Sequence, residues 1–179
     1  MFTAFTPDTA PERSRPALAG SLKLFGFVPS PMALMASSPS ALEGFARLMQ
    51  VFERTSLSPL EREVLIFTVA RHNGCHYCMA MHSAMTARQG HADLLPALRE
   101  GLPLADAELE ALRQFVLVLL QRKGAATDEE LARFAQAGFT AENALDAVVG
   151  ISLFTLSTFA NRLTRAPLDA PFEPFAWKE

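Results

Sequence analysis

Hydrophobic residues recur at helical spacing through most of the chain between residues 40 and 165. In the first such segment, Ser40–Arg54, the apolar positions are Leu42, Phe45, Leu48, Met49 and Phe52. Intervals of three and four residues place them on one face of a helix. Residues 64–70 differ, because they are apolar at nearly every position. A helix that is apolar all round is buried, so this second segment predicts a buried helix.

Capping residues and glycines mark where the helices begin and end. Ser58-Pro59-Leu60-Glu61 combines a cap residue, a proline at the first helical position and a glutamate three residues after the cap, which is a strong start signal. With this helix, which ends near His72, the predicted helices are Ser40–Arg54, Cys75–Gln89, Ala92–Arg99, Asp106–Lys123, Thr127–Gly138 and Thr140–Arg165. No segment alternates as a strand would. The prediction is an all-α fold of about seven helices.

Prolines gather at the two ends of the chain. Of the twelve, six precede Ala41 and three follow Ala166. Proline lacks an N–H group and resists helix interiors. We therefore predict an irregular N-terminal arm at residues 1–39, a helical domain at 40–165 and a C-terminal arm at 166–179.

Composition and charge exclude some classes of function. The net charge is only -3 and no basic run is present, which gives no support to nucleic-acid binding. The longest apolar run, Ala147–Ala160, falls short of the roughly 20 residues that span a bilayer, and residues 1–16 lack a signal-peptide core. We expect a soluble, cytoplasmic protein without a membrane partner. Half of the residues are apolar and fourteen are phenylalanine, a hint of oligomer interfaces.

Both cysteines lie in one short stretch, Cys75-His76-Tyr77-Cys78-Met79-Ala80-Met81-His82. On a helix, spacings of three and four bring Cys75, Cys78 and His82 onto one face. Gly74 precedes this stretch, so the thiols belong to the first helical turn. Free N–H groups and the helix dipole stabilise a thiolate there. His82 can accept a proton from a thiol or hold the thiolate as an ion pair.

Glu63 is predicted to face His82 across a helical hairpin. The tight link Asn73-Gly74 makes the two helices antiparallel, and counting back from it places residues 63–66 level with His82. A carboxylate at the edge of a buried helix needs a partner, and Glu63 would orient the imidazole and tune its basicity. The opposing interpretation is a solvated first-turn carboxylate that the helix dipole favours.

The spacing of these residues resembles the signature of the alkyl hydroperoxidase D-like, or carboxymuconolactone decarboxylase, superfamily. Eleven residues separate Glu63 from Cys75, two separate the cysteines, and three separate Cys78 from His82. The flanking order is similar to that of its peroxidase-related branch: Asn73-Gly74-Cys75-His76-Tyr77-Cys78, His82-Ser83-Ala84, Ala137-Gly138-Phe139-Thr140 and Asn161-Arg162. The resemblance covers roughly residues 40–165.

The resemblance implies thiol-dependent reduction of hydroperoxides by an all-helical protomer that forms trimers or hexamers. By position, Cys78 would be the low-pKa peroxidatic thiol that becomes a sulfenic acid. Cys75 would be the proton donor and the resolving thiol that closes a Cys75–Cys78 disulfide, and His82 and Glu63 would form the proton relay. No cofactor would be bound, and an external dithiol of the lipoyl type would supply the electrons.

One position departs from the best-known members of the superfamily. They carry a histidine immediately before the second cysteine, where this chain has Tyr77, with His76 one place earlier. Tyr77 and His76 are therefore possible pocket residues, although Tyr77 could equally pack in the core and His76 could be an ordinary surface histidine.

Other interpretations of the two thiols remain open at this point. A c-type haem site needs a histidine directly after the second cysteine, where Met79 stands. Structural zinc needs four ligands, so it would need a fourth from His72, His76 or His91. A thioredoxin-like site expects a βαβ context, which is absent from the pattern. The non-enzymatic alternative is a redox-sensing or zinc-binding helical oligomer.

Overall fold

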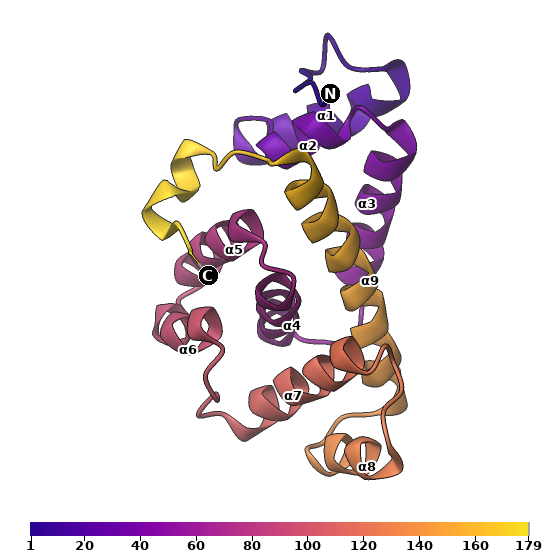
Figure 1. Ribbon diagram of the computed structural model, residues 1–179, viewed down its shortest axis with the longest axis vertical. Coiled ribbons are helices and arrows are strands. Elements are labelled where there is room, and N and C mark those ends of the chain that lie inside the picture. Colours follow the sequence, from indigo (N-terminus) through magenta and orange to yellow (C-terminus); the bar gives the residue numbers. More distant parts are fainter. Residues whose placement is uncertain (179) are drawn as a thin grey trace.

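The structure, a computed structural model, describes residues 1–178, in which nine α-helices and three short 3-10 helices form the fold (Figure 1). The predicted all-α class is confirmed. Seven helices match the predicted segments to within a few residues: α3 (Pro39–Phe52), α4 (Pro59–His72), α5 (His76–Arg88), α6 (Leu95–Glu100), α7 (Ala107–Gln121), α8 (Asp128–Gln136) and α9 (Ala141–Thr164).

Helix α4 is the centre of the fold. Figure 1 views it nearly end-on, with α5, α7 and α9 around it, and these three helices make its main contacts. Every residue from Glu63 to Ala70 is buried, as the apolar pattern predicts. The helix begins with the predicted capping box, in which Ser58 and Glu61 each bind the other's backbone N–H, so Glu61 has a structural role.

The N-terminal arm differs from the irregular segment that the prolines predict. It contains a 3-10 helix (Glu12–Ser14) and two α-helices, α1 (Arg15–Phe25) and α2 (Ser30–Met35). Pro16 and Pro31 lie in the first turns of these helices, where no N–H group is needed and the fixed φ angle favours the helix. Buried apolar side chains of the arm, including Leu18, pack against Leu42 of α3.

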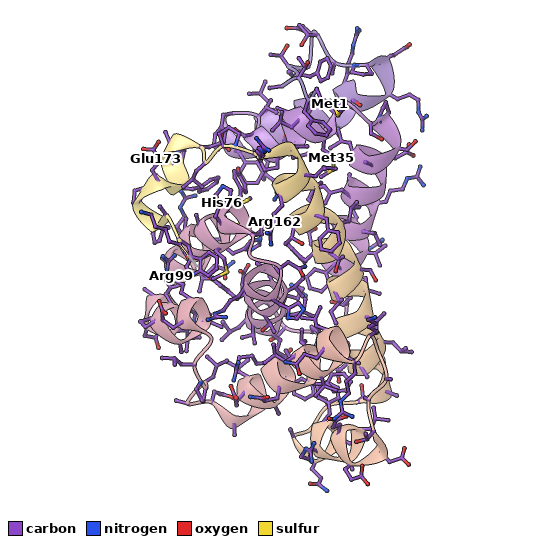
Figure 2. The ribbon with its side chains drawn as sticks, viewed as in Figure 1. Met1, Met35, His76, Arg99, Arg162 and Glu173 are labelled. Atoms are coloured by element: carbon purple, nitrogen blue, oxygen red, sulfur yellow. The ribbon has the colours of Figure 1, made fainter. Side chains whose placement is uncertain are left out.

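The C-terminal arm lies across α5 and contains a 3-10 helix (Ala170–Phe175) but no α-helix among the described residues; residue 179 of the predicted arm lies outside them (Figure 1). The side chains of Phe172 and Trp177 are buried. Arg99, labelled in Figure 2, donates hydrogen bonds to Ser83 Oγ on α5 and to the carbonyls of Phe175 and Ala176. The arm is therefore fastened onto the helix that carries the cysteines.

Helix α9 is 24 residues long, and an 18-residue window within it has a mean hydropathy of 1.4, so it could span a membrane by length and composition. In the fold α9 packs along α2, α3, α4 and α7, and 33% of this window is buried. These contacts favour a core helix. It also carries polar side chains that reach the cysteines.

Candidate active site

The two cysteines lie within hydrogen-bond distance of each other at the start of α5. Cys75 is the cap residue, and its Sγ accepts the backbone N–H of Cys78 at 3.5 Å. The two sulfurs are 3.2 Å apart, and both thiols are free. Gly74, with a φ of 61°, makes the tight turn that begins the helix. The chain thus presents a reduced dithiol on the positive end of a helix.

Two polar side chains of α9 contact the dithiol from the opposite side. The Nδ2 of Asn161 donates to Cys78 Sγ at 3.3 Å and to Cys75 Sγ at 3.7 Å. Ser157 Oγ lies 3.8 Å from Cys78 Sγ. Asn161 is only 2% exposed. The sequence analysis gave Asn161 no role at the thiols. A pair of polar residues four apart in an apolar helix was the available signal.

The same end of α9 also holds the turn that precedes the cysteines. Asn73 donates from Nδ2 to Thr158 Oγ1 at 2.9 Å, and the Arg162 guanidinium donates to the Asn73 carbonyl. Arg162 is labelled in Figure 2. These contacts fix the α4–α5 turn against α9, so the distance from Asn161 to the sulfurs is set by two separate attachments.

The pKa values of the two thiols are shifted in opposite directions. The pKa of Cys75 is lowered from 9.0 to about 7, first by the hydrogen bond from the Cys78 thiol, against the cost of burial, with further help from the Cys78 N–H and Asn161. The pKa of Cys78 is raised well above 9.0 by its hydrogen bond to Cys75 and by burial. The hydrogen bond between the thiols thus favours the thiolate at Cys75 and the proton at Cys78.

Glu63 and His82 form a buried pair beside the dithiol. His82 Nδ1 lies 2.9 Å from Glu63 Oε2, and both side chains are less than a tenth exposed. Thr86 Oγ1 donates to the same carboxylate oxygen at 3.4 Å, and the His82 ring packs edge-on against Phe154. Glu63 does not point to solvent. Within the described residues no hydrogen bond joins His82 to either sulfur, so only the carboxylate–imidazole half of the predicted relay is in direct contact.

Tyr77 packs in the core, beneath the C-terminal arm. Its hydroxyl donates to Asp169 Oδ2 at 2.6 Å, and its ring lies edge-on to Phe172. Burial, followed by the hydrogen bond to Asp169, raises the Tyr77 pKa far above its ordinary value. Asp169 also accepts from the backbone N–H of Ser30. His76, labelled in Figure 2, is exposed on α5.

No zinc site forms among residues 1–178, where no three His, Cys, Asp or Glu side chains converge on a point that could hold a metal ion. His72 and His76 are exposed, and the imidazole of His82 is bound to Glu63. The four-ligand set that structural zinc needs therefore has no counterpart in this part of the chain.

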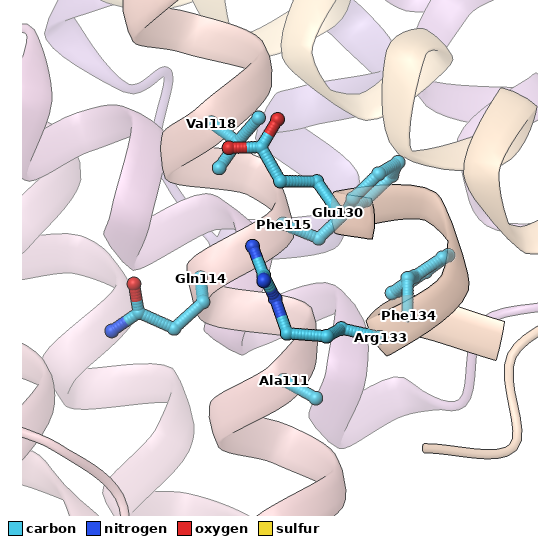
Figure 3. Close-up of a pocket in the computed structure, with 7 residues that line it drawn as sticks. All are labelled: Ala111, Gln114, Phe115, Val118, Glu130, Arg133 and Phe134. Carbon is cyan, nitrogen blue, oxygen red and sulfur yellow. The ribbon is translucent and has the colours of Figure 1, made fainter. Parts of the chain in front are cut away.

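Two cavities, of about 260 and 240 Å³, lie away from the dithiol. Figure 3 shows the first, between α7 and α8, lined by Ala111, Gln114, Phe115, Val118, Glu130, Arg133 and Phe134. The second lies between α4, α6 and α7, where Arg71, His72 and Arg113 are among its lining residues. Neither Tyr77 nor His76 lines these cavities.

Comparison with known proteins places this geometry in context. The model of the carboxymuconolactone decarboxylase family matches residues 39–93, which include the dithiol, Glu63 and His82. No curated protein matches the sequence. The fold is similar to the alkylhydroperoxidase AhpD core of an uncharacterized peroxidase-related protein from Ralstonia eutropha JMP134, at 19% identity and a TM-score of 0.83 over 96% of this chain and 93% of that one.

Two further solved structures share the fold. A peroxidase-related protein from Silicibacter sp. TM1040 is 19% identical, with a TM-score of 0.75 over 90% of this chain and 87% of that one. A cysteine-to-alanine variant of the debrominase Bmp8, in complex with 2,3,4-tribromopyrrole, is 17% identical, with a TM-score of 0.77 over 98% and 95%. Residues 39–93 match the carboxymuconolactone decarboxylase family, and the chain shares the fold of these peroxidase-related proteins, in agreement with the resemblance seen in the sequence.

Proposed function

We propose that the protein is a thiol-dependent hydroperoxide reductase in which Cys75 and Cys78 are the redox pair. The observation that carries this proposal is the dithiol itself: two free sulfurs 3.2 Å apart in the first turn of a helix, one with its pKa lowered to about 7. A thiolate is the reactive form of cysteine, and a second thiol within reach allows a disulfide to form. The peroxidase-related relatives of the same fold support a general peroxidase-like role.

The proposed reaction begins with a proton shift between the sulfurs. Cys78 passes its proton to Cys75 along their hydrogen bond, which leaves the thiolate on Cys78. This sulfur attacks the hydrogen-bearing oxygen of the hydroperoxide, so that an S–O bond forms and the O–O bond breaks. The departing alkoxide takes the proton of Cys75 and leaves as the alcohol. Cys78 is then a sulfenic acid and Cys75 a thiolate.

The second half of the reaction closes the disulfide. The Cys75 thiolate attacks the Cys78 sulfur, the S–O bond breaks, and the hydroxide takes a proton to leave as water. His82, oriented by Glu63, is the residue that supplies this proton through an intervening water. The peroxide has then gained two electrons and the cysteine pair has lost two. An external dithiol restores the pair by thiol–disulfide exchange.

The burial of the site bears on the substrate and the partners. Cys75 is fully buried and Cys78 is 3% exposed, which favours small hydroperoxides. A row of exposed apolar residues on α9, including Leu145, Phe159 and Leu163, supports assembly into a homo-oligomer, a trimer or hexamer in the superfamily's pattern. A reduced dithiol fits a cytoplasmic location. Neither nucleic acid nor a membrane has a part in the proposed reaction.

The test is hydroperoxide consumption by the purified protein with dithiothreitol as the reductant. We expect catalytic consumption by the wild-type protein and none by Cys78→Ser, with unchanged circular dichroism as the check on folding. A Cys78→Ser protein that consumes hydroperoxide at the wild-type rate contradicts the proposal. Because the debrominase Bmp8 has this fold, 2,3,4-tribromopyrrole serves as the comparison substrate in the same assay.

A further inference from the structure

Only one of the two polar atoms of the Asn161 side-chain amide has hydrogen-bond partners. Its Nδ2 donates to both sulfurs, whereas its Oδ1 is the one buried side-chain nitrogen or oxygen atom in residues 1–178 that has no hydrogen-bond partner. The orientation of the amide follows from charge, because a thiolate accepts hydrogen bonds from an NH₂ group and repels a carbonyl oxygen. Nδ2 therefore faces the sulfurs, and Oδ1 of the same amide is held beside the dithiol.

An unpaired buried oxygen destabilises a fold, and such atoms are rare in proteins unless they have a role. The neighbouring buried polar side chains of α9 have partners in the helix or in adjacent segments. Thr158 Oγ1, for example, donates to the Phe154 carbonyl and accepts from Asn73. The unpaired acceptor next to the nucleophile points to a hydrogen-bond donor that arrives with the substrate.

We propose that Asn161 binds the hydroperoxide, with Oδ1 accepting the O–H of the substrate while Nδ2 holds the attacking thiolate. This inference rests on the proposed function. It assigns Asn161 as a catalytic residue, because the side chain touches both the nucleophile and the substrate. The ligand class is defined by the group that Oδ1 recognises, a peroxide that keeps its O–H, such as hydrogen peroxide or an alkyl hydroperoxide.

The geometry suits the chemical step. The oxygen that carries the hydrogen is the one that the Cys78 sulfur attacks, so a hydrogen bond to Oδ1 holds this atom beside Sγ, which is 3.3 Å from Nδ2 of the same amide. As the S–O bond forms and the O–O bond breaks, the electron pair leaves with the alkoxide, which takes the Cys75 proton. The O–H stays on the transferred oxygen and remains bonded to Oδ1 as the sulfenic acid.

The experiment compares two reagents on the same thiols. Methyl methanethiosulfonate reacts with thiolates but has no hydrogen-bond donor, so its rate reports nucleophilicity alone, whereas hydrogen peroxide also needs Oδ1. Both rates are measured by stopped flow at the pH where each variant has the same thiolate fraction. In Asn161→Leu we expect the ratio of the peroxide rate to the thiosulfonate rate to fall by at least about tenfold, because the reacting oxygen is no longer positioned.

Asn161→Asp separates the two ends of the amide. It keeps an acceptor oxygen and loses the donor to the sulfurs, so the thiol pKa should rise while the rate ratio at matched thiolate fraction stays near the wild-type value. Thr164→Val is the matched control; its hydroxyl bonds only to backbone carbonyls of α9, and both the pKa and the ratio should be unchanged.

Three results overturn the inference. If the ratio of the two rates in Asn161→Leu equals that of the wild type, Asn161 does not position the peroxide, and the proposed function stands without this role. If Asn161→Leu does not fold, a lost ratio in Asn161→Asp overturns the proposal by itself. If the wild-type thiols react with the thiosulfonate and not with hydrogen peroxide, the proposed function fails and this inference fails with it.

Discussion

The dithiol site and the cavity between α7 and α8 are opposites. The dithiol site has reactive groups and almost no exposed surface, since the sulfurs of Cys75 and Cys78 are enclosed by α4, α5 and α9. The cavity has about 260 Å³ of space, but its lining includes no cysteine, serine, threonine or histidine (Figure 3). The contrast teaches that a cavity and a cluster of chemically reactive side chains need not coincide in this fold.

The polar groups of the cavity are occupied by structural contacts. Glu130 accepts the backbone N–H of Thr127 in the capping box of α8 and pairs with Arg122 at 3.2 Å. Two residues that line the cavity, Phe115 and Phe134, belong to a stack of three phenylalanine rings, in which Phe134 lies between Phe115 and Phe139 at centroid distances of 3.9 and 4.4 Å. This stack packs α8 against α7 and so stabilises the fold.

The largest expected effect on activity belongs to the dithiol. Cys75→Ser removes the resolving thiol and the proton donor, so turnover with dithiothreitol should fall by a factor on the order of 10² or more. The sulfenic acid at Cys78 should persist and be trapped by dimedone. Turnover at the wild-type rate, without a trapped adduct, would show that a group other than Cys75 reacts with the sulfenic acid. The dithiol would then no longer be the reactive unit that sets this region apart from the cavity.

The buried pair of Glu63 and His82 should come next. In Glu63→Gln we expect the peroxide rate to fall by about tenfold, less than for a group that transfers the proton itself, because Glu63 acts through His82. The pH dependence of the rate should change as well, which loss of packing alone would not cause. Glu61→Gln is the control: this glutamate caps α4 and does not contact His82, so its peroxide rate should equal that of the wild type.

The pH dependence of thiol reactivity tests the lowered pKa of Cys75. Because the Cys75 pKa is lowered from 9.0 to about 7 and the thiolate is the reactive form, labelling should accelerate as pH rises, by about tenfold between pH 6 and 8, and then level off. In Cys78→Ala the midpoint should move upward, since the first cause of the lowered pKa, the hydrogen bond from the Cys78 thiol, is removed. A wild-type midpoint near pH 9 would show that the sulfurs behave as independent thiols.

The smallest effect on activity is expected in the α7–α8 cavity. Phe134→Ala removes the middle ring of the stack and should lower the free energy of unfolding by about 3–5 kcal/mol, measured by denaturant titration. The peroxide rate per folded molecule should not change. A selective loss of peroxide activity in a folded Phe134→Ala protein would show that this cavity takes part in the reaction.

The helical hairpin and its contents were predictable because they depend on local spacing. The turn at Asn73-Gly74 and the register of α4 against α5 place Glu63 opposite His82, and both follow from counting residues along two helices. The capping boxes likewise involve residues three apart. These features need no knowledge of the rest of the fold.

The partners that the sequence interpretation missed come from distant segments. Asn161 is 83 residues from Cys78, and Asp169 is 92 residues from Tyr77, so neither contact follows from local spacing. The pKa order of the thiols depends on which sulfur accepts the hydrogen bond, which is a matter of three-dimensional geometry. The helices of the N-terminal arm were missed because Pro16 and Pro31 were taken as breakers, whereas both lie in first turns.

The central claim is that the two thiols reduce a hydroperoxide as one unit. Its most direct test is mass spectrometry of the reduced wild-type protein after one equivalent of hydrogen peroxide, with a free-thiol count on the same sample. We expect both thiols to disappear together, with a peptide map that shows a Cys75–Cys78 disulfide and no added oxygen. Two thiols that remain free and unmodified after the peroxide has been added would contradict the claim.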